Sequence, residues 1–134
     1  MRSIIRLWAD EAGESHFEDV ELTFEELDDF FENTPPVLMS SFESASQYGF
    51  ELVPPGWQGG WHPAPQRILA IYLSGEGEIE ASDGEVRAIV PGTILLAEDT
   101  IGRGHRNRVT GSSEVSMVLV ILPDIQPNPE SRRT

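Results

Sequence analysis

The sequence predicts a single all-β domain, either a β-sandwich or a closed jelly roll. From Phe50 onward, short apolar runs recur at regular intervals, with Gly, Pro and Asp-Gly turn signals between them. Few segments carry the 3.6-residue periodicity of an amphipathic helix. A length of 134 residues fits one domain with its own hydrophobic core. We therefore expect six or more strands around one core.

The first part of the chain predicts an arm before the barrel. "SIIRLW" at 3–8 predicts a short strand, and "ESHFEDVELTF" at 14–24 predicts an extended segment. "TFEELDDFFEN" at 23–33 is compatible with a helical turn, because Thr23 and Glu26 have the spacing of a capping box. Pro35 and Pro36 favour a loop with one short strand after them. We expect an arm with packing strands over 1–48, a barrel core over 49–123 and a flexible tail over 124–134.

The predicted core strands follow one another with short connections. Asp83 and Gly84 separate two of them and predict a type I′ hairpin turn, which needs a positive φ at both residues. The runs "ILAIYL" and "SMVLVIL" are apolar on both faces, as in strands that also pack against another subunit, so we expect a homodimer. In order, the strands are "FELVP", "RILAIYL", "EIEAS", "EVRAIV", "TILLA", "HRNRV" and "VSMVLVIL".

Composition excludes several classes of chemistry. The chain has 23 acidic and 9 basic residues, a formal charge of −14, no cysteine, and arginine as its only strongly basic residue. Without lysine there is no Schiff-base chemistry, and without cysteine there is no thiol nucleophile and no disulfide. The acidic balance argues against nucleic acid as a partner. The sequence has no apolar run long enough for a membrane span and no signal-peptide pattern, so we expect a soluble cytoplasmic protein without a membrane partner.

Two stretches resemble the motifs of the cupins. "GWHPAPQRILAIYLSGEGEIE" at 60–80 resembles the first cupin motif, G-x(5)-H-x-H-x(3,4)-E-x(6)-G, and "PGTILLAEDTIGRGHRNRV" at 91–109 resembles the second. "GESHFEDV", "WHPAP", "LSGE" and "EDTIGRGH" together resemble a subgroup of uncharacterised bacterial single-domain cupins. The resemblance covers about residues 1–122. It implies a double-stranded β-helix, the cupin jelly roll, that holds a small organic molecule inside the barrel.

The resemblance also implies where a metal would bind, and the chain departs from that pattern. With Gly75 setting the register, His62 and His105 occupy two of the usual histidine positions. Ala64 stands where the family has its second histidine, and Ile68 stands where it has a glutamate. A divalent metal (Fe, Zn, Mn or Ni) would therefore need a further oxygen ligand. Three residues could supply that oxygen: Glu98, Asp99 and Gln66. Glu98 and Asp99 stand where a strand turns into a loop, and the expected role of both is to hydrogen-bond loop amides or to pair with Arg103 or Arg106.

A metal-free reaction is the alternative for the same two histidines. His62 and His105 would then be catalytic acid or base groups. Some sugar-epimerising cupins use a histidine base and a tyrosine acid, and the resemblance implies the same role for Tyr72. Alternation in "GHRNRV" places His105 and Asn107 on the inner face with Val109. Expected ligand-binding residues are Trp61, Gln66, Ile68, Asn107 and Asp99.

Two weaker candidates lie outside these motifs. His16 shares the parity of Val20 and is a third histidine that could face the pocket. The basic patch of Arg103, Arg106 and Arg108 either holds a ligand carboxylate or phosphate, or forms salt bridges with surface acids.

Two classes of function remain open. One is an isomerase, lyase or oxygenase that acts on a small organic substrate. The other is a non-catalytic ligand-binding or sensing cupin without metal. Both require the imidazoles of His62 and His105 to converge on one enclosed cavity.

Overall fold

The computed structural model describes residues 2–28 and 30–124, and all regular secondary structure in that part of the chain is β-strand. None of these residues forms a helix long and apolar enough to cross a bilayer. The predicted flexible tail lies almost wholly outside the described residues. The eleven strands are β1 Ser3–Ala9, β2 Ser15–Glu21, β3 Glu25–Leu27, β4 Val37–Met39, β5 Gln47–Val53, β6 Ile68–Ser74, β7 Gly77–Ala81, β8 Val86–Ile89, β9 Ile94–Ala97, β10 His105–Val109 and β11 Val115–Ile121.

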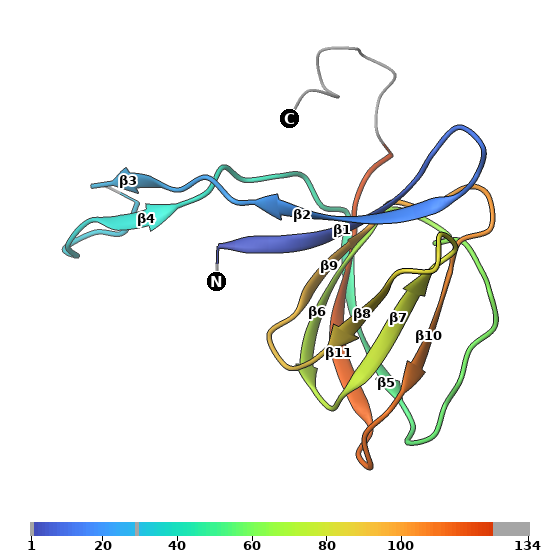
Figure 1. Cartoon of the computed structure of the whole chain (residues 1–134). Coiled ribbons are helices and arrows are strands. Elements are labelled where there is room, and N and C mark those ends of the chain that lie inside the picture. Colours follow the sequence, from blue (N-terminus) through green and yellow to red (C-terminus); the bar gives the residue numbers. More distant parts are fainter. Residues whose placement is uncertain (1, 29, 125–134) are drawn as a thin grey trace.

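The strand order is that of a jelly roll (Figure 1). The larger sheet has the order β2-β1-β9-β6-β11-β5, and the smaller sheet has the order β10-β7-β8. The segment 58–62 extends the smaller sheet, because it bridges to β10 at Gln58↔Arg108 and His62↔His105. The row β5-β11-β6-β9 therefore faces the row (58–62)-β10-β7-β8. Successive strands cross between these rows except at the β7–β8 hairpin, as in two interleaved Greek keys. The predicted all-β jelly roll is confirmed.

The core lies between the two rows. In β7 the burial alternates, because Gly77, Ile79 and Ala81 face inward while Glu78 and Glu80 reach the surface. Each large apolar side chain buried there contributes about 1.5–3 kcal/mol to folding. The buried apolar residues are Leu7, Phe17, Val53, Ala64, Ala70, Tyr72, Ile79, Ala81, Ile89, Leu95, Ala97, Val109, Val115 and Met117.

The first two strands belong to the larger sheet. β1 runs parallel to β9, with Leu7 beside Ala97, and pairs antiparallel with β2. These strands confirm the extended conformation expected for 3–8 and 14–24. The helical turn expected over 23–33 is wrong, because Glu25–Leu27 pairs antiparallel with Val37–Met39. A helix of that length is marginal without tertiary packing, whereas the hairpin satisfies the same backbone groups.

The β7–β8 turn differs from the expected type I′ turn. Gly84 has a φ of 97°, but Asp83 is not among the described residues with positive φ. The Gly84 N–H donates to the Ala81 carbonyl at 3.0 Å, and the Ala81 N–H donates to the Glu85 carbonyl at 2.9 Å. This is a type I turn followed by a left-handed glycine, the usual solution for a longer hairpin loop. The predicted hairpin is present, and only its turn type was wrong.

Candidate functional site

His62 and His105 lie side by side at one end of the barrel. The His62 N–H donates to the His105 carbonyl at 2.9 Å, and the His105 N–H donates to the His62 carbonyl at 2.9 Å. Residues paired in this way place their side chains on the same face of a sheet. The two ring centroids are 4.7 Å apart, and the rings are tilted by 56°. The structure thus brings the two candidate histidines together.

His105 is oriented by a buried carboxylate. It begins β10 and is 8% exposed, while Asp99 is fully buried in the preceding loop. The His105 ring donates its Nδ1–H to Asp99 Oδ2 at 2.6 Å, which leaves the Nε2 lone pair free. Asp99 Oδ1 has no hydrogen-bond partner. An imidazole held by a carboxylate in this way can act as a general base.

His62 has the same arrangement on the solvent side. Its Nδ1 is 3.0 Å from the Gly60 carbonyl oxygen, so Nδ1–H donates and Nε2 is the free nitrogen. The residue is exposed. The His105 side chain is 10% exposed. Its Nε2 makes no hydrogen bond within the described residues and is not fully buried, so solvent can reach it. Both histidines therefore offer a free Nε2 at the rim of the barrel.

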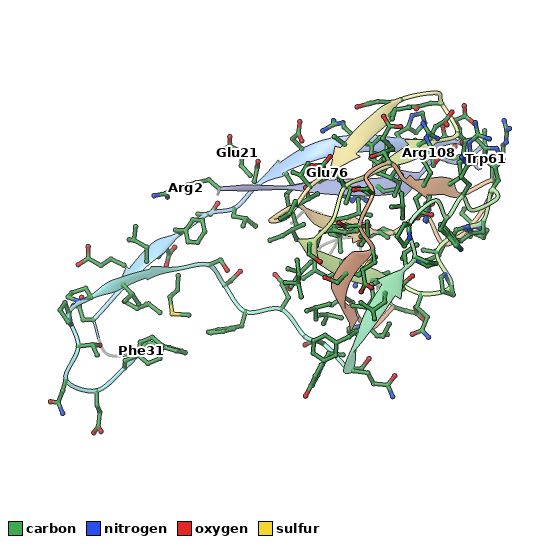
Figure 2. The ribbon with its side chains drawn as sticks, turned by 90° about the horizontal axis from the view of Figure 1, so that it is seen from below. Arg2, Glu21, Phe31, Trp61, Glu76 and Arg108 are labelled. Atoms are coloured by element: carbon green, nitrogen blue, oxygen red, sulfur yellow. The ribbon has the colours of Figure 1, made fainter. Side chains whose placement is uncertain are left out.

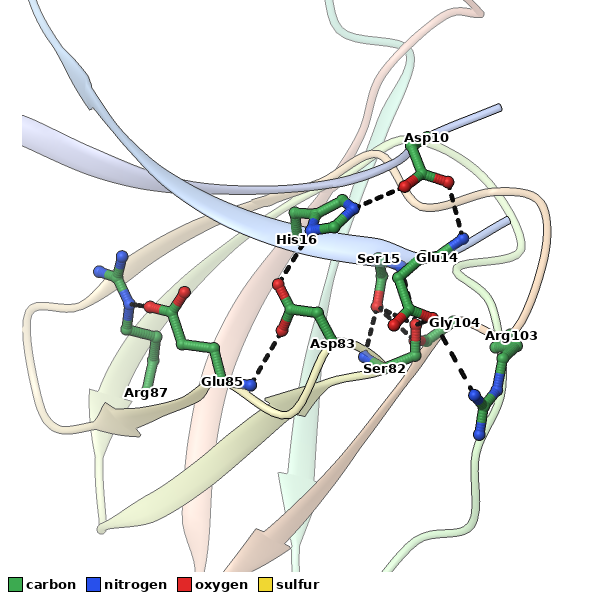
Figure 3. Close-up of polar contacts among 10 residues, drawn as sticks. All are labelled: Asp10, Glu14, Ser15, His16, Ser82, Asp83, Glu85, Arg87, Arg103 and Gly104. Carbon is green, nitrogen blue, oxygen red and sulfur yellow. Dashed lines mark hydrogen bonds and ion pairs between the residues drawn. The ribbon is translucent and has the colours of Figure 1, made fainter. Parts of the chain in front are cut away.

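A glycine and a buried serine hold the loop that carries His105. Gly104 has a φ of 75°, and a Cβ at this position would clash with the His62 carbonyl oxygen. Only glycine allows this close approach without strain. The fully buried Ser15 donates its Oγ–H to the Gly104 carbonyl at 2.7 Å (Figure 3). The spacing of the two imidazoles thus depends on Gly104 and on an anchor from β2.

The histidines do not share the internal cavity of the barrel. That cavity has a free volume of about 10 Å³, room for about one water molecule, and it is lined in part by Tyr72, Asn107 and Trp57. Neither histidine lines it. The expectation that both rings face one enclosed cavity is therefore wrong: large apolar side chains fill the barrel, and His62 is exposed.

Tyr72 and Asn107 line the small cavity of the barrel, which neither histidine lines. Tyr72 is 4% exposed, and burial, helped by the charge of Glu51, raises the pKa of its phenol above the usual range. Asn107 shares the inner face of β10 with His105, and its buried Oδ1 has no partner. The structure does not bring Tyr72 together with the histidine pair.

The other expected ligand-binding residues lie outside the histidine pair. Trp61 is 38% exposed and lies under the guanidinium groups of Arg106, at 4.8 Å, and Arg103, at 5.8 Å. Successive strand residues point to opposite faces, so Trp61 faces away from the side of His62. Gln66 is exposed, and Ile68 is half-buried at the start of β6.

The donor set does not fit a metal held by protein side chains. The described residues contain no group of three or more His, Asp or Glu side chains that could hold a metal ion. Asp99 is engaged with His105, and Glu98 is bound by Arg6 at 2.5 Å and by Arg67 at 2.7 Å. These contacts differ from the pairing with Arg103 or Arg106 that the sequence suggested for the two acids. Ala64 is buried, and its N–H donates to the Asp99 carbonyl.

The basic patch consists largely of salt bridges. Arg106 binds Glu80 at 3.0 Å, and Arg108 binds Glu78 at 3.0 Å and Glu80 at 3.3 Å. The hydrogen bond from Arg106 is the main reason why the pKa of Glu80 is lowered. Arg103 differs, because its side chain is 65% exposed and its ion pair with Glu14 spans 4.0 Å. Arg103 is thus the guanidinium of this patch that can most easily take a ligand carboxylate.

His16 lies between two surface carboxylates and does not line the barrel cavity. We call the group Asp10, His16 and Asp83 the clasp. His16 Nε2 lies 2.7 Å from Asp10 and its Nδ1 lies 2.9 Å from Asp83, so it joins the β1–β2 and β7–β8 turns (Figure 3). The hydrogen bond with Asp10 is the main reason why the pKa of His16 is raised. Its ring also lies 5.0 Å from that of Trp8.

Sequence reasoning missed the roles of three residues. Asp99 orients His105, Ser15 anchors Gly104, and Gly104 allows the close approach to His62. The only sequence signal was the Gly-rich stretch "IGRGH" after an acidic strand end.

Comparisons with known proteins find likenesses among solved structures. No protein-family model and no curated protein matches the chain. A predicted oxalate decarboxylase from Thermotoga maritima is 22% identical, with 77% of this chain and 95% of that chain covered and a TM-score of 0.47. The Cnp3 cupin domain of Schizosaccharomyces pombe is 16% identical, with 92% and 86% covered and a TM-score of 0.46. The capsular polysaccharide assembling protein CapF of Staphylococcus aureus is 17% identical, with 93% and 32% covered and a TM-score of 0.45.

These likenesses are too distant to say anything about activity. The strand order is the firmer observation, because the two facing rows and their Greek-key connections follow from the pairing of the chain itself. By that order the chain has a jelly-roll fold.

Proposed function

We propose that this protein binds a small organic molecule at the rim of the barrel and catalyses a metal-independent proton transfer on it, as an isomerase or lyase does. The observation that carries the proposal is the Asp99–His105 pair, whose free Nε2 lies beside the ring of His62. The rim is where both imidazoles meet solvent and where a substrate can reach them.

His105 is suited to the part of the general base. Its Nε2 takes a proton from a substrate carbon or oxygen, and Asp99 stabilises the imidazolium that forms. Asp99 needs no movement for this, because its Oδ2 already accepts the Nδ1–H at 2.6 Å.

His62 is suited to the part of the acid. Its Nδ1–H is held by the Gly60 carbonyl, so its protonated form donates from Nε2 toward the rim. The ring centroids of His62 and His105 are 4.7 Å apart, so both imidazoles can reach one bound molecule. One protonated and one neutral imidazole are what an acid–base reaction requires.

Arg103 favours an organic acid as the ligand. It lies two residues before His105, and its mostly exposed guanidinium has one ion pair, at 4.0 Å. A guanidinium recognises a carboxylate through two parallel hydrogen bonds. A carboxylate bound there leaves the rest of the molecule to reach the histidine rim.

A proton-exchange assay tests this proposal. Small hydroxy and oxo acids are incubated with the protein in D₂O, and loss of their acidic C–H signal is followed by ¹H NMR. We expect one class to exchange, and we expect His105→Gln to slow that exchange about 10²- to 10⁴-fold. His16→Gln is the matched control, because it removes a histidine outside the site. Exchange that survives His105→Gln unchanged would refute the assignment of the base.

A non-catalytic ligand-binding module is the second candidate. It is favoured by the exposure of His62, because a site open to water lacks the solvent exclusion that usually strengthens catalytic groups. Under this alternative, an organic acid raises the melting temperature of the wild type but not of His62→Gln, and no compound in the panel exchanges its protons.

A further inference from the structure

Four strands of the larger sheet, β5, β11, β6 and β9, have an uncharged outer surface in a strongly acidic chain. Along β5, β11, β6 and β9, the positions that alternate with the buried core residues carry no charged side chain. The formal charge of the chain is −14. We call this surface the outer face; its members are Tyr48, Phe50, Leu52, Leu69, Ile71, Leu73, Ile94, Leu96, Ser116, Val118 and Val120.

The β5 edge of the outer face is bare. Tyr48 is 76% exposed, Phe50 is 73% exposed and Leu52 is 66% exposed. They pair across the ladder with Val120, Val118 and Ser116, so the apolar surface continues inward from the edge strand. Soluble monomers rarely expose a continuous apolar surface of this kind.

Of the arm predicted over 1–48, β1 and β2 join the larger sheet, and the described residues 24–28 and 30–42 do not. From here on, the arm means this second part, which carries another apolar surface. Its strands β3 and β4 form a two-stranded sheet of their own, outside both barrel sheets. Figures 1 and 2 show the arm leaving the barrel, with Phe31 at its far end. Phe42, 73% exposed, stacks on Phe30 at 5.7 Å, and Phe31 meets Phe30 edge-on at 4.7 Å. Phe30 is 45% exposed and Phe31 is 52% exposed, so this aromatic cluster is largely uncovered.

We propose that a second copy of this chain covers both surfaces, with the arm of each copy lying across the outer face of the other. Each copy carries both surfaces, and its arm points away from its own barrel, so a two-fold pair can cover all four surfaces at once. The outer face carries no carboxylate that would repel the acidic residues of the partner's arm.

The available area matches what a stable dimer needs. With about 200 Å² for each aromatic side chain, the exposed fractions of Tyr48, Phe50, Phe30, Phe31 and Phe42 amount to roughly 600 Å² per copy. Two copies then bury about 1,200 Å² before any Leu or Val is counted, which is within the range of specific interfaces.

Other partners fit this surface less well. A basic protein finds no carboxylate on the outer face to pair with, and an anionic bilayer repels a chain of charge −14. A second copy satisfies the chemistry of both surfaces without any further component.

Light scattering coupled to size-exclusion chromatography tests the outer face. We expect the wild type to have twice the 14.9 kDa chain mass at micromolar concentration, and Phe50→Glu to have the chain mass itself. Val90→Glu, which adds the same charge at a 47% exposed position beyond the outer face, should remain a dimer. Far-UV circular dichroism checks that each variant is folded. A monomeric wild type, or a Phe50→Glu variant that stays dimeric, would overturn the proposal.

A photo-cross-link tests the exchange of arms. A benzoylphenylalanine at position 42 is placed in ¹⁴N protein, which is mixed with unmodified ¹⁵N protein, and cross-linked peptides are identified by mass. We expect links from position 42 of one copy to residues of β5 or β11 of the other. Links confined to a single copy would show that the arm folds back on its own chain and would overturn the exchange.

Discussion

Replacing Asp99 with Asn keeps the shape of the side chain and changes only what it offers to His105. In the wild type the carboxylate accepts the Nδ1–H at 2.6 Å from a fully buried position. An amide can place its NH₂ toward Nδ1, because the other oxygen, Oδ1, makes no hydrogen bond that would resist the rotation. The ring would then accept at Nδ1 and carry its proton on Nε2, so the base would be lost.

The expected magnitudes for rate and stability differ. Loss of a correctly oriented base costs about 10²- to 10⁴-fold in rate. The free energy of unfolding should change by only about 1–2 kcal/mol, because a charge-assisted hydrogen bond is replaced by a neutral one while the cost of burying a charge is relieved. A catalytic defect without unfolding is therefore the signature of an orienting carboxylate.

The assay is ¹⁵N NMR of the histidine ring nitrogens, together with the proton-exchange rate. In the wild type we expect the neutral form of His105 to carry its proton on Nδ1, and in Asp99→Asn to carry it on Nε2. Asp10→Asn is the matched control, because it removes a carboxylate from His16 instead. If Asp99→Asn keeps both the tautomer and the exchange rate of the wild type, the reasoning about this pair is refuted.

Three further predictions address the support of the site, the clasp and the metal. Gly104→Ala should lower the free energy of unfolding, measured in urea melts, by about 2–4 kcal/mol, because it combines a positive φ with a clash against the His62 carbonyl. Gly92→Ala is the control, since Gly92 has a φ of 93° in open surroundings, and it should lower the free energy of unfolding by only about 1–2 kcal/mol. Equal losses in the two variants would contradict the close approach of Gly104 to His62. The raised pKa of His16 means that the clasp contributes its full stability below the ordinary value of 6.5 and loses it as pH rises through the folded value. The lowered pKa of Asp10 sets the other limit, because its contribution is present above the ordinary value of 3.8 and is lost as pH falls through the folded value. The melting temperature of His16→Gln should therefore fall furthest below that of the wild type between pH 3.8 and pH 6.5. A difference in melting temperature that grows toward pH 9 would contradict the role of the charged His16. Protein purified without chelator should hold well under one equivalent of Fe, Zn, Mn or Ni by elemental analysis. One equivalent of metal that disappears in a His62→Ala/His105→Ala variant would show that the two histidines do hold a metal.

Much of the fold could be predicted because it follows from local patterns. Period-two alternation with turn residues between the runs gave the strands of the barrel, and alternation in "GHRNRV" placed His105 and Val109 on the inner face. The helical turn predicted for 23–33 was wrong because a capping-box spacing carries no information about a strand that pairs ten residues later, as Val37 does with Leu27. The side of Trp61 could not be predicted, since it depends on the bridge between 58–62 and β10.

The site was less predictable because its geometry comes from contacts distant in sequence. Alternation gives the direction of a side chain but not the depth of a cavity, which depends on how Tyr72 and its neighbours fill the barrel. The link from Ser15 to Gly104 joins residues 89 positions apart, and no local pattern marks it. The pairing of Asp99 with His105 spans only six residues, yet it requires a loop conformation that the sequence alone leaves open.

The most direct test of the account is a ¹⁵N-histidine NMR titration of the whole protein with small organic acids. We predict that the ring signals of His62 and His105 shift together and saturate at the same ligand concentration, while those of His16 stay in place. A ligand that raises the melting temperature but moves neither ring would contradict the account, because it would bind elsewhere and leave the paired imidazoles without a role.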